Sequence, residues 1–172
     1  MQCSEEILDV VDEADRVVRQ ATRSEVHARR LWHRAVHVFV FNELGELFLQ
    51  TRSSSKDSFP GRRDSSASGH LNTGEDYDDG AVREISEELG LNVAAVRLRK
   101  LFKIPACAET GWEFVWSYSM QTDESPQPNA QEIESGAFLA PSVIRTMLAR
   151  QPDEFAPSFR RVFEEFDRRG LW

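Results

Sequence analysis

Residues 69–91 read GHLNTGEDYDDGAVREISEELGL and contain the pattern that decides the fold. The second half of this stretch is predicted to be a helix over 76–89. Asp76 can cap its N-terminus, because an aspartate side chain accepts the free N–H groups of a first turn. Gly90 follows the last helical residue and supplies the left-handed conformation in which helices commonly end. The apolar residues recur every four positions and form one buried stripe: Ala81, Ile85 and Leu89.

The same helix carries three glutamates. Glu84, Glu87 and Glu88 stand at i, i+3 and i+4, so their side chains share one face. Like charges at this spacing repel each other, and a divalent cation such as Mg²⁺ or Mn²⁺ relieves the repulsion because it prefers carboxylate oxygens. Arg83 can hold one carboxylate in position. For the helix alone, a solvated acidic face is the commoner explanation.

The spacing over the whole stretch reverses that preference. It resembles the signature of the Nudix hydrolase family, which asks for Gly, five residues, Glu, seven residues, Arg-Glu, an aliphatic residue, any residue, Glu-Glu, any residue, Gly and an aliphatic residue. Every fixed position matches, and a chance match is on the order of one in ten million at average residue usage. The matching residues are Gly69, Glu75, Arg83, Glu84, Ile85, Glu87, Glu88, Gly90 and Leu91.

This resemblance implies an α+β fold, a Nudix-type α/β/α sandwich around a mixed β-sheet, formed by one domain over residues 1–172. It implies that Glu84, Glu87 and Glu88 bind the catalytic Mg²⁺ or Mn²⁺, and that the carbonyl of Gly69 adds a ligand. Arg83 would orient Glu84, while Glu75 and Gly90 support the 69–91 box. The implied reaction is attack of a metal-activated water on a phosphorus of a diphosphate.

A narrower resemblance extends upstream of the box. The segment HRAVHVFVFNELGELFLQTRSSSKDSFPGRRDSSASGH is similar to isopentenyl diphosphate isomerases and the hydrolases closest to them. It implies that Arg52 and Lys56 contact the diphosphate, although basic residues on a mobile loop are the alternative. His33 and His70 match histidines that bind metal in the isomerases. A structural role is the alternative for both, and His70 is the stronger candidate ligand.

Two departures favour hydrolysis over isomerisation. The isomerases place a cysteine before the Gly-His pair, whereas this chain has Ser68, a far poorer acid or base. The isomerases also usually degrade the box, which is intact here. Glu113 matches the acid that acts with that cysteine, so in a hydrolase it is a candidate metal ligand or general base. Glu109 and a solvent-facing Glu113 are the alternatives. A third reading, a non-catalytic nucleotide-sensing domain, is disfavoured because such domains usually lose box carboxylates.

The rest of the chain predicts strands with interspersed helices. An N-terminal β-hairpin is expected over about 5–21, and a central hairpin from strands at 35–41 and 46–51. Further strands are expected at 65–71, 93–104, 112–120 and 133–140, with helices at 141–150 and 157–169. Alternating aromatic residues at 112–118 point to one face of their strand, and packing or nucleobase stacking would explain them.

Composition limits the remaining possibilities. The 172-residue chain has a net charge of −8 and is 40% hydrophobic, which predicts a folded domain without a broad nucleic-acid-binding surface. Cys3 and Cys107 are expected to be free thiols. The acidic N-terminus does not resemble a signal peptide, and no membrane span is expected, so we expect a cytoplasmic protein. We expect a monomer or homodimer that acts on a small diphosphate, namely a nucleoside di- or triphosphate or a nucleoside diphosphate derivative.

Overall fold

The computed structural model describes residues 5–172, so Cys3 lies outside the described residues. Nine strands and four α-helices follow one another along the chain: β1 (Ile7–Val11), β2 (Val17–Thr22), α1 (Arg23–Arg29), β3 (His33–Phe41), β4 (Leu47–Arg52), β5 (Arg63–Asp64), β6 (Ala67–His70), α2 (Tyr77–Leu89), β7 (Arg99–Ile104), β8 (Glu113–Gln121), β9 (Ile133–Leu139), α3 (Pro141–Arg150) and α4 (Pro157–Arg168). No helix among these residues is long and apolar enough to span a bilayer.

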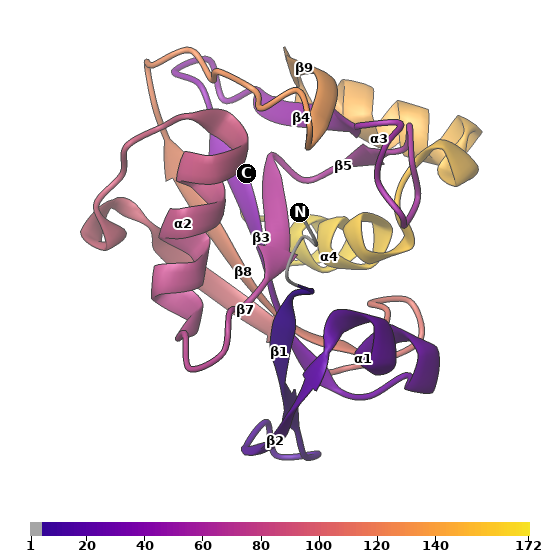
Figure 1. Cartoon of the computed structure of the whole chain (residues 1–172). Helices are drawn as coiled ribbons and strands as arrows, with labels where there is room; N and C mark the ends of the chain where they lie inside the picture. The colour runs from indigo at the N-terminus through magenta and orange to yellow at the C-terminus, as the bar shows by residue number, and fades with distance from the viewer. Residues whose placement is uncertain (1–4) are drawn as a thin grey trace.

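A mixed seven-stranded sheet forms the centre of the molecule. Its strand order is β5-β4-β3-β8-β7, with β6 added to β3 and β9 added to β4. The central strands β3 and β8 run parallel, and the other pairs are antiparallel. Figure 1 shows α2 on one side of these strands and α4 on the other. Separate apolar clusters lie under the two helices, which confirms the predicted α/β/α arrangement.

The predicted central hairpin is confirmed at its turn, where β3 and β4 are antiparallel neighbours, but the two strands do not pair along their length. β3 and β4 are register partners only where they meet, at Phe41 and Leu47. Beyond that point β3 pairs with β6, and β4 pairs with β9 and β5. The turn residues and the alternation of apolar residues correctly predict two strands, but they do not report that later segments compete for the same edges. β6, which contains the first residues of the box, thus takes the edge of β3 that β4 leaves.

Two elements differ from the sequence prediction near the N-terminus and in the 93–104 segment. α1 was not predicted, because only Val26 is buried and so seven residues show no apolar stripe. Thr22 caps this helix by accepting the N–H of Glu25 at 3.3 Å. The strand expected from residue 93 begins at Arg99, since Ala95–Arg97 form a 3₁₀ turn.

The predicted N-terminal hairpin is present as β1 and β2, and it lies beside the box. Asp9 accepts the N–H of Gly74 at 2.8 Å, and Thr73 donates its hydroxyl to the carbonyl of Ile7 at 3.0 Å. Asp15 in the hairpin turn binds Arg34 of β3 at 2.7 Å. The hairpin therefore fixes the loop that leads from Gly69 into α2.

Candidate active site

α2 forms as the sequence predicts and turns its carboxylates toward a pocket. Asp76 caps the helix by accepting the N–H of Asp79 at 2.9 Å, and Gly90 ends it with a φ of 65°. Ala81, Ile85 and Leu89 are each 0% exposed and pack on the sheet. This buried stripe sets the rotation of the helix and directs Glu84 and Glu88 inward.

Arg83 links the carboxylates of the box to one another. Its guanidinium donates to Glu75 at 2.8 Å, to Glu84 at 2.6 Å and to Glu87 at 2.9 Å. It also binds the carbonyl of His70 at 2.8 Å. Burial opposes the charge of Arg83, but these carboxylates outweigh burial and raise its pKa. Arg83 thus positions both the carboxylates and the strand end that precedes the helix.

Glu84 and Glu88 form a buried acidic pair. Glu88 accepts hydrogen bonds from the Gln50 amide at 3.0 Å and from the N–H of Ser68 at 3.1 Å. Burial, with a smaller contribution from the charge of Glu84, raises the pKa of Glu88 to about 8. Burial also raises the pKa of Glu84, although Arg83 acts against it. Two buried carboxylates that repel each other fit a divalent cation. Glu87 differs, because its side chain is 59% exposed and lies against Arg83.

Gly69 is required where Glu84 approaches the strand. A Cβ built on Gly69 would lie 2.2 Å from Oε1 of Glu84. Only glycine therefore lets this carboxylate reach the β6 backbone. This contact explains the first glycine of the box in physical terms.

A second cluster lies beside the box and contains three histidines. The ligand atoms of His27, His33 and His70 all lie within 4.8 Å of one another, and among the described residues they are the one set of three His, Cys, Asp or Glu side chains that does so. The three box glutamates do not meet that distance in this structure. Nδ1 of His33 is 2.9 Å from the carbonyl of Leu31, which places its proton on Nδ1 and leaves a lone pair on Nε2. That Nε2 is buried and has no hydrogen-bond partner among residues 5–172.

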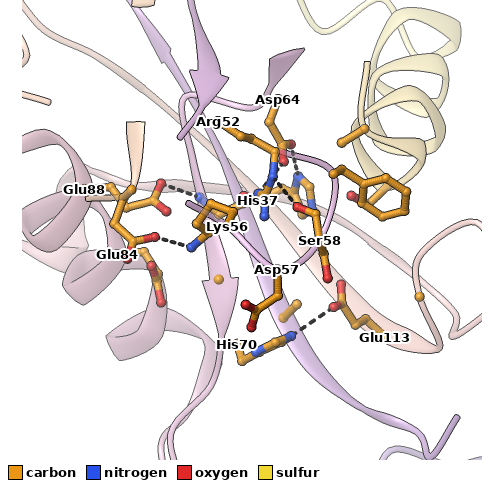
Figure 2. Close-up of a pocket in the computed structure, with 18 of the residues that line it drawn as sticks. His37, Arg52, Lys56, Asp57, Ser58, Asp64, His70, Glu84, Glu88 and Glu113 are labelled. Carbon is orange, nitrogen blue, oxygen red and sulfur yellow. Dashed lines mark hydrogen bonds and ion pairs between the residues drawn. The ribbon is translucent and has the colours of Figure 1, made fainter. Parts of the chain in front are cut away.

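Glu113 completes this second cluster. Its Oε1 lies 3.1 Å from Nε2 of His70 and 3.5 Å from Nε2 of His33, so it faces the pocket rather than solvent (Figure 2). Burial opposes its charge, but the neighbouring His33 and His70 imidazoles outweigh burial and lower its pKa. Burial alone would lower the pKa of His70, but the contacts of His70 with Glu113 and Glu6 outweigh burial and raise this pKa to about 9. A buried lone pair, two further imidazoles and a carboxylate at this spacing fit a divalent metal ion.

The predicted diphosphate-binding residues line the same pocket, but both are engaged with acids. Arg52 binds the buried Asp64 at 3.0 Å and the carbonyl of Ser58 at 3.1 Å. Lys56 forms an ion pair with Glu132, in which both side chains remain partly exposed. Lys56 can therefore exchange its partner for a phosphate more readily than Arg52. The whole pocket has a volume of about 1000 Å³.

The aromatic residues of β8 face away from this pocket. Phe114 and Tyr118 are buried, and Trp116 packs edge-on against Tyr77 of α2. This placement favours the packing explanation, and none of these rings lines the pocket. Trp112 departs from the expected alternation, because its φ of 69° places it outside the strand.

The titratable pocket residues that the sequence did not reveal include Glu6, His27 and His37. His27 belongs to the short helix that lacked a pattern, and Glu6 lies at the start of the hairpin. His37 could have been found from the sequence, because it lies an even number of residues after His33 on the same strand. Their side chains therefore point to the same face of the sheet.

Comparison with known proteins agrees with this geometry. The NUDIX domain model matches residues 31–165. An uncharacterised Nudix hydrolase of Streptomyces coelicolor is 36% identical over 160 residues, covering 91% of this chain and 86% of the relative. A Nudix hydrolase of Deinococcus radiodurans is 32% identical over 165 residues, covering 94% and 96%. A crystal structure of a protein from that organism superimposes with a TM-score of 0.78 at 31% identity, covering 95% and 98%.

The fold, the intact box and these relatives together define a class: the chain belongs to the Nudix family and is a pyrophosphohydrolase. The narrower resemblance is also confirmed. An isopentenyl-diphosphate Delta-isomerase of Photorhabdus laumondii is 25% identical over 160 residues, covering 92% of this chain and 90% of the relative.

Proposed function

We propose that this chain hydrolyses the diphosphate linkage of a nucleoside di- or triphosphate, or of a nucleoside diphosphate derivative, and that it requires Mg²⁺ or Mn²⁺. The observation that supports this most directly is the buried pair of Glu84 and Glu88. Keeping two carboxylates out of water beside each other costs stability, and a cation that binds both of them offsets that cost.

The roles of the chain's residues follow from their contacts. Glu84, Glu87 and Glu88 hold one metal site together with the carbonyl of Gly69, and Arg83 positions Glu84 and Glu87. When bound, the metal lowers the pKa of water and neutralises charge on the bridging phosphates. Lys56 leaves Glu132 to contact the diphosphate, while Arg52 holds the 52–63 loop in place through Asp64.

A second site is formed by the histidine cluster. His70, His33, His27 and Glu113 hold a metal here, with Glu113 as a ligand rather than the general base. A carboxylate whose pKa is lowered by two histidines is a weak proton acceptor, which makes it better suited to binding than to proton transfer.

The pocket size and the residue before Gly69 support a nucleotide substrate. A volume of about 1000 Å³ is at the upper end of small-molecule sites and accommodates a nucleotide. Ser68 occupies the position of the isomerase cysteine, and its side chain cannot move a proton at carbon near neutral pH.

The test is a hydrolysis assay with Mg²⁺ or Mn²⁺ on nucleoside di- and triphosphates, nucleotide sugars and isopentenyl diphosphate. Phosphate or nucleoside monophosphate should be released by the wild type, and Glu84→Gln should lower kcat at least ~100-fold because it displaces a metal ligand. Glu164→Gln, on the exposed face of α4, is the matched control and should keep full activity. Double-bond migration without hydrolysis, or binding without turnover in every metal, would reject the proposal.

A further inference from the structure

Phe59 lies on the loop between β4 and β5 and lines the pocket. Of the Phe, Tyr and Trp residues within 5–172, it is the one that does so. Its exposed fraction is 45%, and it is not part of the apolar clusters on the two faces of the sheet. A phenylalanine that anchored its loop would be buried in such a cluster. The ring of Phe59 is therefore available to a ligand in the pocket.

The backbone holds Phe59 in an unusual conformation. Its φ of 51° lies in the left-handed region, which a bulky side chain rarely adopts. Pro60 and Gly61 follow in a tight turn, in which the carbonyl of Phe59 accepts the N–H of Arg62 at 3.3 Å and Gly61 has a φ of 69°. Such strain persists only where the surroundings enforce it, and it is concentrated at ligand-binding sites.

The surroundings of the turn do enforce this conformation. The carbonyl of Arg52 accepts the N–H of Gly61 at 3.1 Å, and the N–H of Arg52 donates to the carbonyl of Arg62 at 2.8 Å. The guanidinium of Arg52 donates to the carbonyl of Ser58 at 3.1 Å, next to Phe59. Because the loop is fixed before any ligand arrives, little ordering entropy is lost when a ligand contacts Phe59.

The loop lies across the pocket from the buried acidic pair. Figure 2 shows Glu84 and Glu88 on one side and Ser58 on the other, with Lys56 between them in this view. Phe59 follows Ser58 in the chain, so it belongs to the side away from the carboxylates. A substrate whose diphosphate lies between the carboxylates and Lys56 can therefore extend its next group toward Phe59, within a pocket of about 1000 Å³.

We propose that Phe59 stacks on the base of the nucleoside whose diphosphate linkage is cleaved. The other side chains of the pocket are mainly charged or small and polar, so Phe59 supplies the flat apolar surface that a base requires. This inference rests on the proposed hydrolase function and narrows its substrate class to nucleoside compounds. Every base has a π-face, so stacking on Phe59 should tolerate both purines and pyrimidines.

The first test compares KM and kcat for a nucleoside diphosphate in two variants. Phe59→Leu keeps an apolar side chain but loses the π-face, and it should raise KM about 5–100-fold, the range for one base–aromatic stack. The value of kcat should stay unchanged, because the base lies away from the reacting phosphorus. Phe59→Trp should keep KM near that of the wild type. A residue that only anchors the loop would give the reverse order, since leucine fits an apolar site better than the larger tryptophan.

The chain supplies a matched control for the loss of an exposed aromatic ring. Trp172 is 39% exposed and does not line the pocket. Trp172→Leu makes the corresponding chemical change elsewhere on the molecule and should leave KM unchanged.

The second test does not depend on hydrolysis. Calorimetry with Mg²⁺ measures the binding of adenosine monophosphate and of ribose 5-phosphate, which share a sugar phosphate and lack a diphosphate linkage. The wild type should bind the nucleotide about 5–100-fold more tightly, and Phe59→Leu should lose most of that preference.

Equal binding of the two compounds by the wild type, or an unchanged preference in Phe59→Leu, would overturn the stacking contact. A KM that rises in Phe59→Trp but not in Phe59→Leu would overturn it as well. If the preference depends on Phe59 but no diphosphate is hydrolysed, the proposed hydrolase function fails and the base-binding role of Phe59 remains.

Discussion

At the scale of single residues, the box could be read from the sequence because each position is constrained by a close contact. Gly69 must lack a side chain because Glu84 lies against its backbone, and Arg83 must reach three carboxylates at once. The sequence did not reveal that Glu87 would be exposed while Glu84 and Glu88 are buried, since helical spacing places all three on one face without reporting what covers it.

Gly69→Ala should therefore disable the enzyme without unfolding it. The new methyl group would displace the carboxylate of Glu84, and a shift of about 1 Å in a catalytic group costs about 100-fold in rate. The checks are kcat with saturating metal and a thermal melt. Gly80→Ala on α2 is the control, because its Cβ would approach no atom closer than 3.3 Å. Full activity in Gly69→Ala would mean that Glu84 is not held in the working geometry.

Glu88→Gln should lower activity and raise stability. A glutamine keeps an oxygen that can accept the Ser68 N–H. It lacks the ionisable carboxyl group, which in Glu88 has a raised pKa because it is buried beside Glu84. We expect about 1–2 kcal/mol of added stability in chelator near neutral pH, because a buried carboxylate with a raised pKa destabilises the fold above its unfolded pKa and a glutamine does not. Denaturant unfolding measures this change. A less stable variant would indicate that Glu88 has a structural role that requires its charge.

At the scale of elements, sequence pattern predicted what forms locally and failed where elements compete. The turn between β3 and β4 is present, yet β6 and β9 take the edges that a simple hairpin would use. α1 could not be predicted from apolar periodicity, because a single buried residue forms no repeating pattern. The helix nevertheless contributes His27 to the pocket. Both differences depend on contacts between segments far apart in the sequence, and local sequence patterns carry no information about such contacts.

The hairpin β1–β2 should depend on Asp15 for its attachment. The side chain of Asp15 is 9% exposed and binds Arg34, Lys103 and Tyr77. Burial would raise its pKa, but these three hydrogen bonds lower it below its ordinary value. Asp15→Asn tolerates the φ of 59°, since asparagine readily adopts it, and removes the charge. A loss of about 3 kcal/mol near neutral pH is expected for breaking such a pair.

The stability that Asp15 contributes should depend on pH. A carboxylate whose folded pKa is depressed stabilises the fold above its unfolded pKa of about 4, and this stability is lost as pH falls through the folded pKa. Wild type and Asp15→Asn should therefore differ near neutral pH and converge in acid. Urea unfolding at several pH values measures the difference, with the exposed Glu13→Gln in the same turn as control. A difference independent of pH would contradict the charge-based explanation.

At the scale of the whole molecule, the two candidate metal clusters connect parts of the chain that the sequence leaves far apart. The acidic pair belongs to α2, whereas the histidine cluster joins α1, β3, β6 and β8. His33, His70 and Glu113 can be identified from the sequence only through resemblance to a family. Their convergence arises from the parallel pairing of β3 with β8, which sets His33 opposite Glu113.

Metal binding should consequently stabilise the fold through two separate sites. At about 100 times its dissociation constant, a ligand adds about 2.7 kcal/mol, which for a chain of this size corresponds to a rise in Tm of about 5–10 °C. In thermal melts with saturating Mn²⁺ and with chelator, Glu84→Gln should lose the contribution of the box site, and His33→Ala that of the histidine site. Each variant should retain part of the shift because the clusters use different side chains. An unchanged shift in His33→Ala would show that the histidines hold no metal, and loss of the entire shift in either variant would show that the two clusters form one site.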